Sequence, residues 1–461
     1  MATILDLSRA ISAGRLSPVK LTEEYLARIE RLDGRINSYI TVLREESLRS
    51  AEAAEAELRE GRVRGPLHGI PVSVKDLIYI NGVRCTAGSK ILSNHVAGYD
   101  SPVVRRLKQS GAVIIGTTNM HEFACGATSV NPHFGPVRNP WNTERIAGGS
   151  SGGSAASVAA DLAIASIGTD TSGSVRIPAS LCGVVGLKPT YGLISRIGVI
   201  PLAASFDTVG TLTMSAWDAA AMLSILAGHE QNDMTTADVE IPDYIVEINN
   251  ARNFRVGVPR NYFMDVVDAG VEESFNRFTE KLTSLGFEVK PVEFKDMDRA
   301  VESWAAIRRA EATAFHERWL EEMPDQYGED VRMSLELGRQ IPATRYINAQ
   351  NGRPALRESF LDSMREVDLV ATPTTPITAP VIGQSKVSVK STEVDVYSAL
   401  VRLTLPFNVV GFPALSIPIG LFDGLPVGAQ LVGRPFEESA LLQLAHAYEG
   451  RFGQFEKPKL D

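Results

Sequence analysis

Two glycine- and serine-rich segments contain the residue types that could carry out a reaction in this sequence. They are residues 146–154 (IAGGSSGGS) and residues 168–176 (GTDTSGSVR). Glycines let the backbone adopt positive φ and approach a ligand closely, and consecutive N–H groups in such turns bind anions. The segments therefore suit either a phosphate group or the oxyanion that forms when a serine attacks a carbonyl group.

A nucleotide-binding loop is the weaker interpretation. Neither segment continues into Gly-Lys-Ser/Thr, and Pro189 stands where the helix after the nearby Gly-Leu-Lys would have to begin. A Ser-His-Asp hydrolase is a second alternative, because G-x-S-x-G occurs around both Ser150 and Ser151. That motif needs a preceding strand and a downstream histidine, yet residues 145–147 make a poor strand. We interpret the histidines as surface, packing or structural residues: His121, His133, His229, His316 and His446.

A serine nucleophile without a histidine needs another base, and Lys75 lies in a run, residues 72–76 (VSVKD), that is apolar enough to bury it. The ordinary lysine pKa of about 10.4 makes deprotonation at pH 7 cost on the order of 4.6 kcal/mol, which burial of the amine would have to supply. The alternative is an exposed ion pair between Lys75 and Asp76. The residues alone leave both interpretations open.

The spacing of Lys75, Ser150 and Ser174, with the motifs around the two serines, closely resembles that of the amidase signature family. The resemblance covers residues 67–210 and extends more weakly to both ends. It implies an α/β fold, with a single domain in which a twisted mixed β-sheet is sandwiched between helical layers. It also implies hydrolysis of amide C–N bonds through an acyl-enzyme, with no metal and no cofactor.

The resemblance assigns a role to each matching position. Lys75 would be the general base, Ser150 the bridging serine after a cis peptide bond, and Ser174 the nucleophile. The N–H groups of the oxyanion hole would belong to Thr171, Ser172, Gly173 and Ser174, although much of the family has glycine where Ser172 stands. Supporting residues would be Asp170, Arg176 and Ser151. The segment that lines the substrate would contain Cys125, Gly126 and Ala127.

The family contains stand-alone amidases and the glutamine-hydrolysing component of glutamyl-tRNA amidotransferase. The sequence pattern of that glutaminase has an acidic residue for the substrate's ammonium group, and Val401 stands in that place here. We therefore expect a stand-alone enzyme for small carboxylic amides. The alternatives are the glutaminase of a tRNA-dependent amidotransferase and a carbamoyl or ureide hydrolase. Candidates for the acyl pocket, each of which could instead pack in the core, are Trp304, Ile307, Tyr346 and Phe407.

The patterning predicts the elements that position these residues. Helical periodicity indicates helices at 18–32, with Ser17 as the cap, and at 44–60. Strands and helices alternate from residue 67, a polar loop covers 228–243, and a charged helical region spans 296–340. Further strands are expected at 254–260, 287–294, 367–376, 414–420 and 427–435, before a helix at 437–451. We expect one domain over 1–461, with N-terminal helices at 1–60, a core at 67–210 and a variable pocket region at 296–400.

Composition limits the classes of partner. The 461 residues carry a net charge of −9 with no basic stripe, which argues against direct nucleic-acid binding. Three cysteines without CxxC spacing, no export signal and no run of about 18 apolar residues favour a cytoplasmic protein. We expect a small-molecule amide as the partner and no membrane, and we leave a homodimer open.

Overall fold

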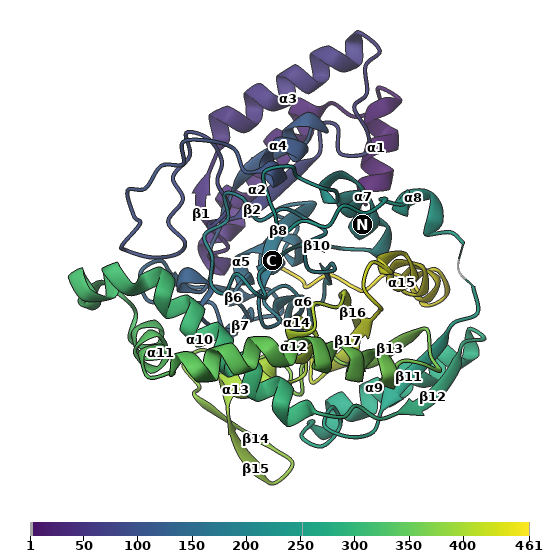
Figure 1. Ribbon diagram of the computed structural model, residues 1–461. Coiled ribbons are helices and arrows are strands. Elements are labelled where there is room, and N and C mark those ends of the chain that lie inside the picture. Colours follow the sequence, from purple (N-terminus) through teal and green to yellow (C-terminus); the bar gives the residue numbers. More distant parts are fainter. Residues whose placement is uncertain (1–2, 251, 461) are drawn as a thin grey trace.

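An eleven-stranded mixed β-sheet runs through the centre of the computed structural model, which describes residues 3–250 and 252–460 (Figure 1). The spatial order is β1-β3-β2-β8-β10-β9-β16-β17-β13-β11-β12. These strands are β1 (Tyr39–Val42), β2 (Pro71–Lys75), β3 (Val113–Thr118), β8 (Ala165–Asp170), β9 (Val185–Lys188), β10 (Thr208–Thr213), β11 (Arg255–Pro259), β12 (Glu288–Val292), β13 (Leu369–Pro373), β16 (Ala414–Phe422) and β17 (Leu425–Val432).

Strands β3, β2 and β8 are parallel neighbours, and every residue of the three is buried. Burial on both faces explains why their sequences are apolar runs rather than alternating ones. In the register of β2 and β8, Val74 lies opposite Ile167, so both strands end at the same edge of the sheet. The residues that close these two strands, Lys75 and Asp170, are therefore brought together by the topology.

In the spatial order β8-β10-β9-β16-β17-β13, each strand is antiparallel to its neighbour. Strand β11 pairs in parallel with both β13 and β12. Three two-stranded ribbons lie outside the sheet: β4 (Val130–Asn131) with β5 (Gly135–Pro136), β6 (Arg138–Asn139) with β7 (Asn142–Ile146), and β14 (Lys386–Val389) with β15 (Thr392–Asp395). The expectation of a poor strand at 145–147 was wrong for Arg145 and Ile146. Their strand belongs to a ribbon, however, and not to the central sheet.

Helices cover the sheet on both sides. They are α1 (Ile4–Ser12), α2 (Pro18–Ile36), α3 (Arg44–Arg59), α4 (Pro102–Gln109), α5 (Gly152–Ala159), α6 (Arg176–Cys182), α7 (Ala216–Leu226), α8 (Tyr244–Glu247), α9 (Ala269–Ser284), α10 (Met297–Glu322), α11 (Glu329–Arg339), α12 (Ala343–Ser363), α13 (Val396–Arg402), α14 (Leu405–Val409) and α15 (Glu438–Phe452). Short 3₁₀ turns occur at Glu122–Ala124 and Pro324–Gln326.

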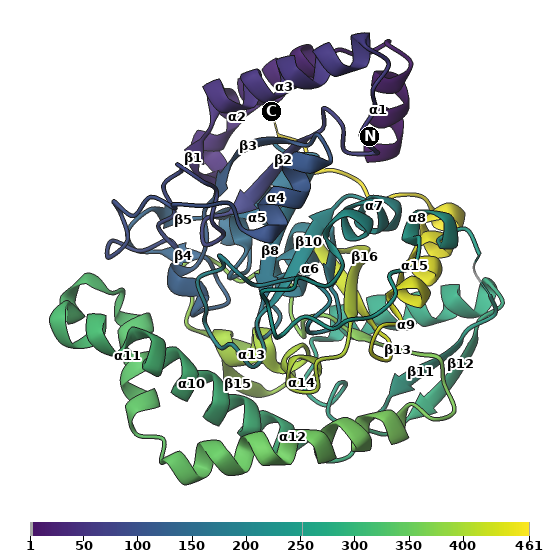
Figure 2. The same ribbon diagram turned by 45° about the horizontal axis from the view of Figure 1, so that its top comes forward.

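The long helices lie at two opposite ends of the molecule. Figures 1 and 2 both show α2 and α3 together at one end and α10, α11 and α12 at the other. Between them, α5 and α6 contact each other, and α6 packs on β9, β16 and β17, whereas α7 contacts β9, β10 and α15. The fold is thus the mixed α/β arrangement expected from the sequence.

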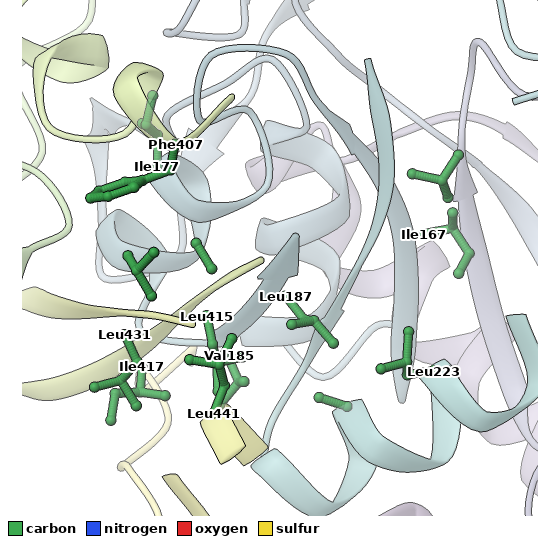
Figure 3. Packing of buried hydrophobic residues seen from close by; sticks show 14 of the residues in the cluster. Ile167, Ile177, Val185, Leu187, Leu223, Phe407, Leu415, Ile417, Leu431 and Leu441 are labelled. Atoms are coloured by element: carbon green, nitrogen blue, oxygen red, sulfur yellow. The ribbon is translucent and has the colours of Figure 1, made fainter. Parts of the chain in front are cut away.

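Buried aliphatic side chains from adjacent strands support the sheet beneath α6. Leu415 of β16 lies opposite Leu187 of β9 and Leu431 of β17, and all three side chains are fully buried. Figure 3 shows them beside Leu441 of α15, another fully buried residue. Because well-packed interiors deform little, this core gives the loop before α6 a rigid base.

Most expected elements are present within a few residues of their predicted ends. Ser17 caps α2, since its hydroxyl accepts a hydrogen bond from the backbone N–H of Lys20 at 3.1 Å. The charged region 296–340 divides into α10 and α11, and the helix α12 was missed, with Pro354 inside it as a misleading signal. Of the helices in the described residues, none is long and apolar enough to cross a membrane.

Candidate active site

Four chain segments meet at the edge where β2 and β8 end. Lys75 closes β2, and Thr169 and Asp170 close β8. Ser150 lies two residues before the first residue of α5, and Ser174 lies two residues before the first residue of α6. The two glycine-serine segments are therefore strand-to-helix or ribbon-to-helix turns whose conformations bring the serines to the same edge of the sheet.

The amine of Lys75 is the centre of the site. Its Nζ atom donates to the hydroxyl oxygens of Ser150 at 2.7 Å, Ser151 at 2.9 Å and Thr169 at 2.9 Å. The residue is fully buried, and so is Asp76, whose carboxylate accepts hydrogen bonds from Thr86 instead. The alternative of an exposed Lys75–Asp76 pair is therefore wrong.

Burial changes the protonation of Lys75. Removal from water lowers the pKa of this lysine from 10.5 to about 7, although the carboxylates of Asp170 and Asp207 act in the opposite direction. Three hydroxyl groups surround the amine, and no carboxylate of residues 3–250 and 252–460 forms an ion pair with it. A lysine with this pKa is neutral in a large fraction of molecules near pH 7, as a general base requires.

The turn that carries Ser150 has the backbone feature that the resemblance implied, since the Gly149–Ser150 peptide bond is cis. The carbonyl of Ser150 accepts hydrogen bonds from the backbone N–H of His121 at 3.1 Å and from the Ser129 hydroxyl at 3.2 Å. The Ser151 hydroxyl donates to the carbonyl of Thr169 at 3.1 Å and accepts from its N–H at 3.2 Å. Ser151 therefore connects the first loop to the end of β8.

The second loop presents Ser174 next to the first. The backbone N–H of Ser151 donates to the carbonyl of Ser174 at 3.1 Å. In the described part of the chain, no hydrogen bond joins the hydroxyls of Ser150 and Ser174, and Ser174 retains 5% exposure. Hydrogen bonds between catalytic groups are often long without substrate and shorten when it binds.

Asp170 and Arg176 brace this loop from inside. The Arg176 guanidinium binds the Asp170 carboxylate through Nε at 3.0 Å and Nη2 at 2.9 Å, and both side chains are fully buried. Burial alone would raise the pKa of Asp170, but Arg176 holds it well below the ordinary value. Arg176 also donates to the side-chain oxygens of Asn408 and Gln430. The Asp170 carboxylate thus connects Arg176 to the backbone of the loop, where it accepts from the N–H groups of Gly173 and Val175.

The Asp170 carboxylate removes Gly173 from the four N–H donors expected for an oxyanion. The N–H of Gly173 donates to Asp170 Oδ1 at 2.8 Å, so it is already used within the protein. The hydrogen bonds of the described residues leave the N–H groups of Thr171, Ser172 and Ser174 without a protein acceptor. Three of the four expected donors therefore remain for an oxyanion.

Glycine is required at position 173 for two reasons. Its φ is +121°, and a Cβ there would lie 2.1 Å from the hydroxyl oxygen of Thr404, which itself donates to the Ser172 carbonyl at 2.6 Å. Ser172 is not among the residues with positive φ, so its side chain is accommodated. The Ser172 hydroxyl accepts a hydrogen bond from Trp304 Nε1 at 2.7 Å.

The segment expected to line the substrate lies against the first loop. A Cβ on Gly149 would lie 3.0 Å from the carbonyl carbon of Ala127, and a Cβ on Gly126 would meet the His121 ring at 2.1 Å. Cys125 is buried, and its sulfur accepts a long hydrogen bond of 3.5 Å from Arg308 Nη1. Ala127 therefore lies against the first serine loop, whereas Gly126 lies against His121 and Cys125 contacts Arg308.

The acyl-pocket candidates separate into two groups. Trp304 contacts the loop 171–174 through Ser172, and the Tyr346 hydroxyl donates to Glu311 Oε1 at 2.9 Å. Ile307 is fully buried, and Phe407 is buried in an aromatic cluster with Phe263, Phe294 and Phe360. The last two candidates are core residues in this structure.

The histidines form other contacts. His121 and His133 face the carboxylates of Asp330 and Glu122, each at 2.9 Å. His316 is paired with the Tyr327 hydroxyl at 2.9 Å, and burial lowers its pKa to about 3. Within residues 3–250 and 252–460, no group of three or more histidine, cysteine, aspartate or glutamate residues could hold a metal ion. These contacts support the structural interpretation of His121, His133 and His316.

Several site residues were not identified from the sequence. Thr169 was inside a recognised motif, but its hydroxyl gave no separate signal. Asn408 and Gln430 are 232 and 254 positions from Arg176, and no spacing rule connects them. Arg308 lay in the charged helical region 296–340, where no motif distinguished it from the other charged residues, yet it is 3% exposed.

Comparisons with known proteins identify the family of this chain. The family model described as Amidase matches residues 20–442. One relative is a component of the glutamyl-tRNA(Gln) amidotransferase of Carboxydothermus hydrogenoformans, namely its A chain. It is 38% identical, with 96% of each chain covered. This name favours the glutaminase alternative over the stand-alone enzyme that we expected.

Solved structures give the same fold. One, described as a vestigial protein complex that reveals the evolutionary origins of an s-triazine catabolic enzyme, has a TM-score of 0.94 and 34% identity over 99% of this chain and 100% of that one. A crystal structure of an amidase has a TM-score of 0.89 and 37% identity over 98% of this chain and 100% of that one. The chain belongs to the amidase signature family, whose enzymes act on amide C–N bonds.

Proposed function

We propose that this protein hydrolyses a carboxylic amide to a carboxylate and ammonia or an amine, with Ser174 as nucleophile, Ser150 as the bridging serine and Lys75 as base. One observation carries the proposal: a fully buried lysine amine lies 2.7 Å from the Ser150 hydroxyl and has a pKa of about 7. The backbone hydrogen bond from the Ser151 N–H to the Ser174 carbonyl supports the proposal, because this bond holds the two serine loops side by side.

The first step forms the tetrahedral intermediate on Ser174. Neutral Lys75 takes the proton of the Ser150 hydroxyl while Ser150 takes that of Ser174, and the Ser174 oxygen attacks the amide carbonyl carbon. The carbonyl oxygen becomes an anion, which the free N–H groups of the loop 171–174 stabilise. Each such donor contributes roughly 3 kcal/mol in acyl-transfer enzymes.

The second step releases the amine. The proton held by Lys75 returns through Ser150 to the leaving nitrogen, the C–N bond breaks, and the Ser174 ester remains. Water then attacks this ester, and its proton passes through Ser150 to Lys75. That proton returns to the Ser174 oxygen as its bond to the acyl carbon breaks, and the carboxylate leaves. These proton transfers use groups of this chain alone.

The acyl group is the point on which the two main candidate functions differ. Val401 favours a stand-alone amidase, because it is a buried apolar residue one helical turn before Thr404, where a glutaminase needs an acid for the ammonium group. The name of the similar proteins favours a glutamine-hydrolysing component that works with partner chains. We propose the stand-alone amide hydrolase and keep the amidotransferase glutaminase as the second candidate, with a carbamoyl or ureide substrate as a third candidate for the same groups.

The test is covalent labelling of the purified protein with a fluorophosphonate probe, mapped by peptide mass spectrometry. Ammonia release from simple amides and from glutamine is measured on the same sample, and Ser174→Ala and Ser151→Ala are the matched variants. We expect label on Ser174, none on Ser174→Ala, and ammonia from simple amides. Label on Ser150 or Ser151 would refute the assignment, and release from glutamine alone would select the second candidate.

A further inference from the structure

Arg308 of α10 is a buried cation without a carboxylate partner. It is 3% exposed, and no ion pair to it is found among the described residues. Its Nη2 donates to the Ser334 hydroxyl at 3.0 Å and its Nη1 to the Cys125 sulfur at 3.5 Å, while its Nε has no partner. Two neutral side chains therefore provide all of its polar contacts within the described part of the protein.

Two aromatic rings enclose the same guanidinium. Its central carbon lies 5.3 Å from the ring centre of Trp304 and 5.7 Å from that of Tyr397. The two rings are stacked on each other at 6.4 Å with an angle of 29°. Aromatic faces stabilise and orient a cation, but they do not neutralise its charge.

The surroundings of Arg308 connect it to the reacting serine from two sides. Trp304 donates a hydrogen bond to Ser172, two positions before Ser174. Cys125 begins the segment 125–127, whose Ala127 lies against the cis peptide bond before Ser150. Arg308 therefore contacts both Trp304, which binds the Ser174 loop, and Cys125, whose segment lies against the Ser150 loop.

A guanidinium stays protonated in proteins, and a buried one is normally paired with an anion. This chain contains the normal case, since Arg176 is equally buried and binds Asp170 through two nitrogens. Arg309 adds a second positive group beside Arg308, so the local potential is more positive still. An anion from outside the protein would complete the site.

We propose that Arg308 binds a carboxylate on the acyl part of the substrate, so that the substrate is the monoamide of a short dicarboxylic acid. The planar guanidinium matches a carboxylate in a two-point hydrogen bond, and Nε with one terminal nitrogen supplies that edge. The proposal rests on the proposed amide hydrolysis at Ser174. It also explains why glutamine is a poor fit, because its additional ammonium group would meet two arginines and Val401.

The experiment compares three amides of the same chain length. Glutaramate carries the carboxylate, pentanamide replaces it with a methyl group, and glutamine adds an ammonium group; malonamate and succinamate test shorter spacing. We expect kcat/KM of the wild-type enzyme to be about 10²-fold or more higher for the best anionic amide than for the neutral amide of the same length, because a site built for a polar group strongly rejects an analogue that lacks it. Glutamine should be hydrolysed more slowly than glutaramate.

Variants of two arginines on the same helix separate recognition from folding. Arg308→Met should remove the preference for the anionic amide while kcat/KM for pentanamide changes only a few-fold, and Arg308→Lys should restore part of it. Arg318→Met removes the same charge from an exposed position of α10 and should keep the preference. Equal hydrolysis of glutaramate and pentanamide by the wild type, or equal losses for both in Arg308→Met, would overturn the proposal.

A binding measurement keeps this proposal distinct from the hydrolysis itself. In calorimetric titration, the product glutarate or succinate should bind the wild type and not Arg308→Met. That result would hold for Arg308 even if Ser174 proved unreactive towards the fluorophosphonate. Equal dicarboxylate binding by wild type and Arg308→Met would refute the assignment even if amides were hydrolysed.

Discussion

The pH dependence of amide hydrolysis should report the protonation of Lys75. Burial lowers the pKa of this lysine from 10.5 to about 7. At pH 7, this shift raises the neutral fraction from about 1 in 3,000 to about one half, which corresponds to roughly 5 kcal/mol of differential interaction. Because the base must be neutral, kcat/KM should rise about tenfold per pH unit below pH 7 and become constant above it.

The matched variants are Lys75→Ala and Lys188→Met. Removal of Lys75 should reduce kcat/KM for an amide by about 10³-fold or more, and for an ester of the same acid less severely, because an amine leaving group needs a proton more than an alkoxide does. Lys188 is the control, since burial also lowers its pKa to about 7, but its Nζ donates to the carbonyl of Pro189 at 2.8 Å. In Lys188→Met, kcat/KM should still rise with pH, and the midpoint of the rise should stay at the same pH as in the wild type.

The assay is the initial rate of ammonia release over pH 5–10, with hydrolysis of the matched ester followed in the same buffers. Thermal unfolding of each variant checks that the fold is retained. Three results would refute the reasoning: a rise centred above pH 9, a rise that persists in Lys75→Ala, or equal losses of amide and ester hydrolysis in that variant.

Three further predictions concern the loop that carries Ser174, the proposed nucleophile. Ser172→Gly removes the hydrogen bond from Trp304, so we expect an increase in KM of several-fold, the effect of about 1 kcal/mol, with the rate of Ser174 labelling unchanged. Asp170→Ala leaves the buried guanidinium of Arg176 unpaired, which should lower the free energy of unfolding by about 3–5 kcal/mol in urea titrations; a loss below about 1 kcal/mol would contradict the bracing role. Gly173→Ala forces a side chain into a backbone with φ +121°, and labelling of Ser174 should slow by at least about 10²-fold, the effect of losing an oxyanion donor; normal labelling would show that the loop tolerates a Cβ.

Much of the reactive machinery could be predicted from short motifs. The residues of 146–154 and 168–176 and their distance from Lys75 were enough to identify the family, and the cis peptide bond before Ser150 is present. Local rules also predicted α2 with its Ser17 cap and most strands, because apolar runs and caps depend on near neighbours. The helix α12 was missed because Pro354 within it is a strong local signal against a helix.

The tertiary structure alone decided which groups surround each charge. It buries Lys75 among three hydroxyls and so lowers its pKa, directs the Gly173 N–H to Asp170, and leaves Arg308 without an anion among the described residues. The sequence by itself determined the family and the class of reaction, since the motifs around Ser150 and Ser174 are runs of contiguous residues. Charge environment and substrate contacts depend mostly on residues far apart in the sequence: Ser150 lies 75 positions from Lys75, and Ser172 lies 132 positions from Trp304. Only the packing of the sheet and helices brings such residues together.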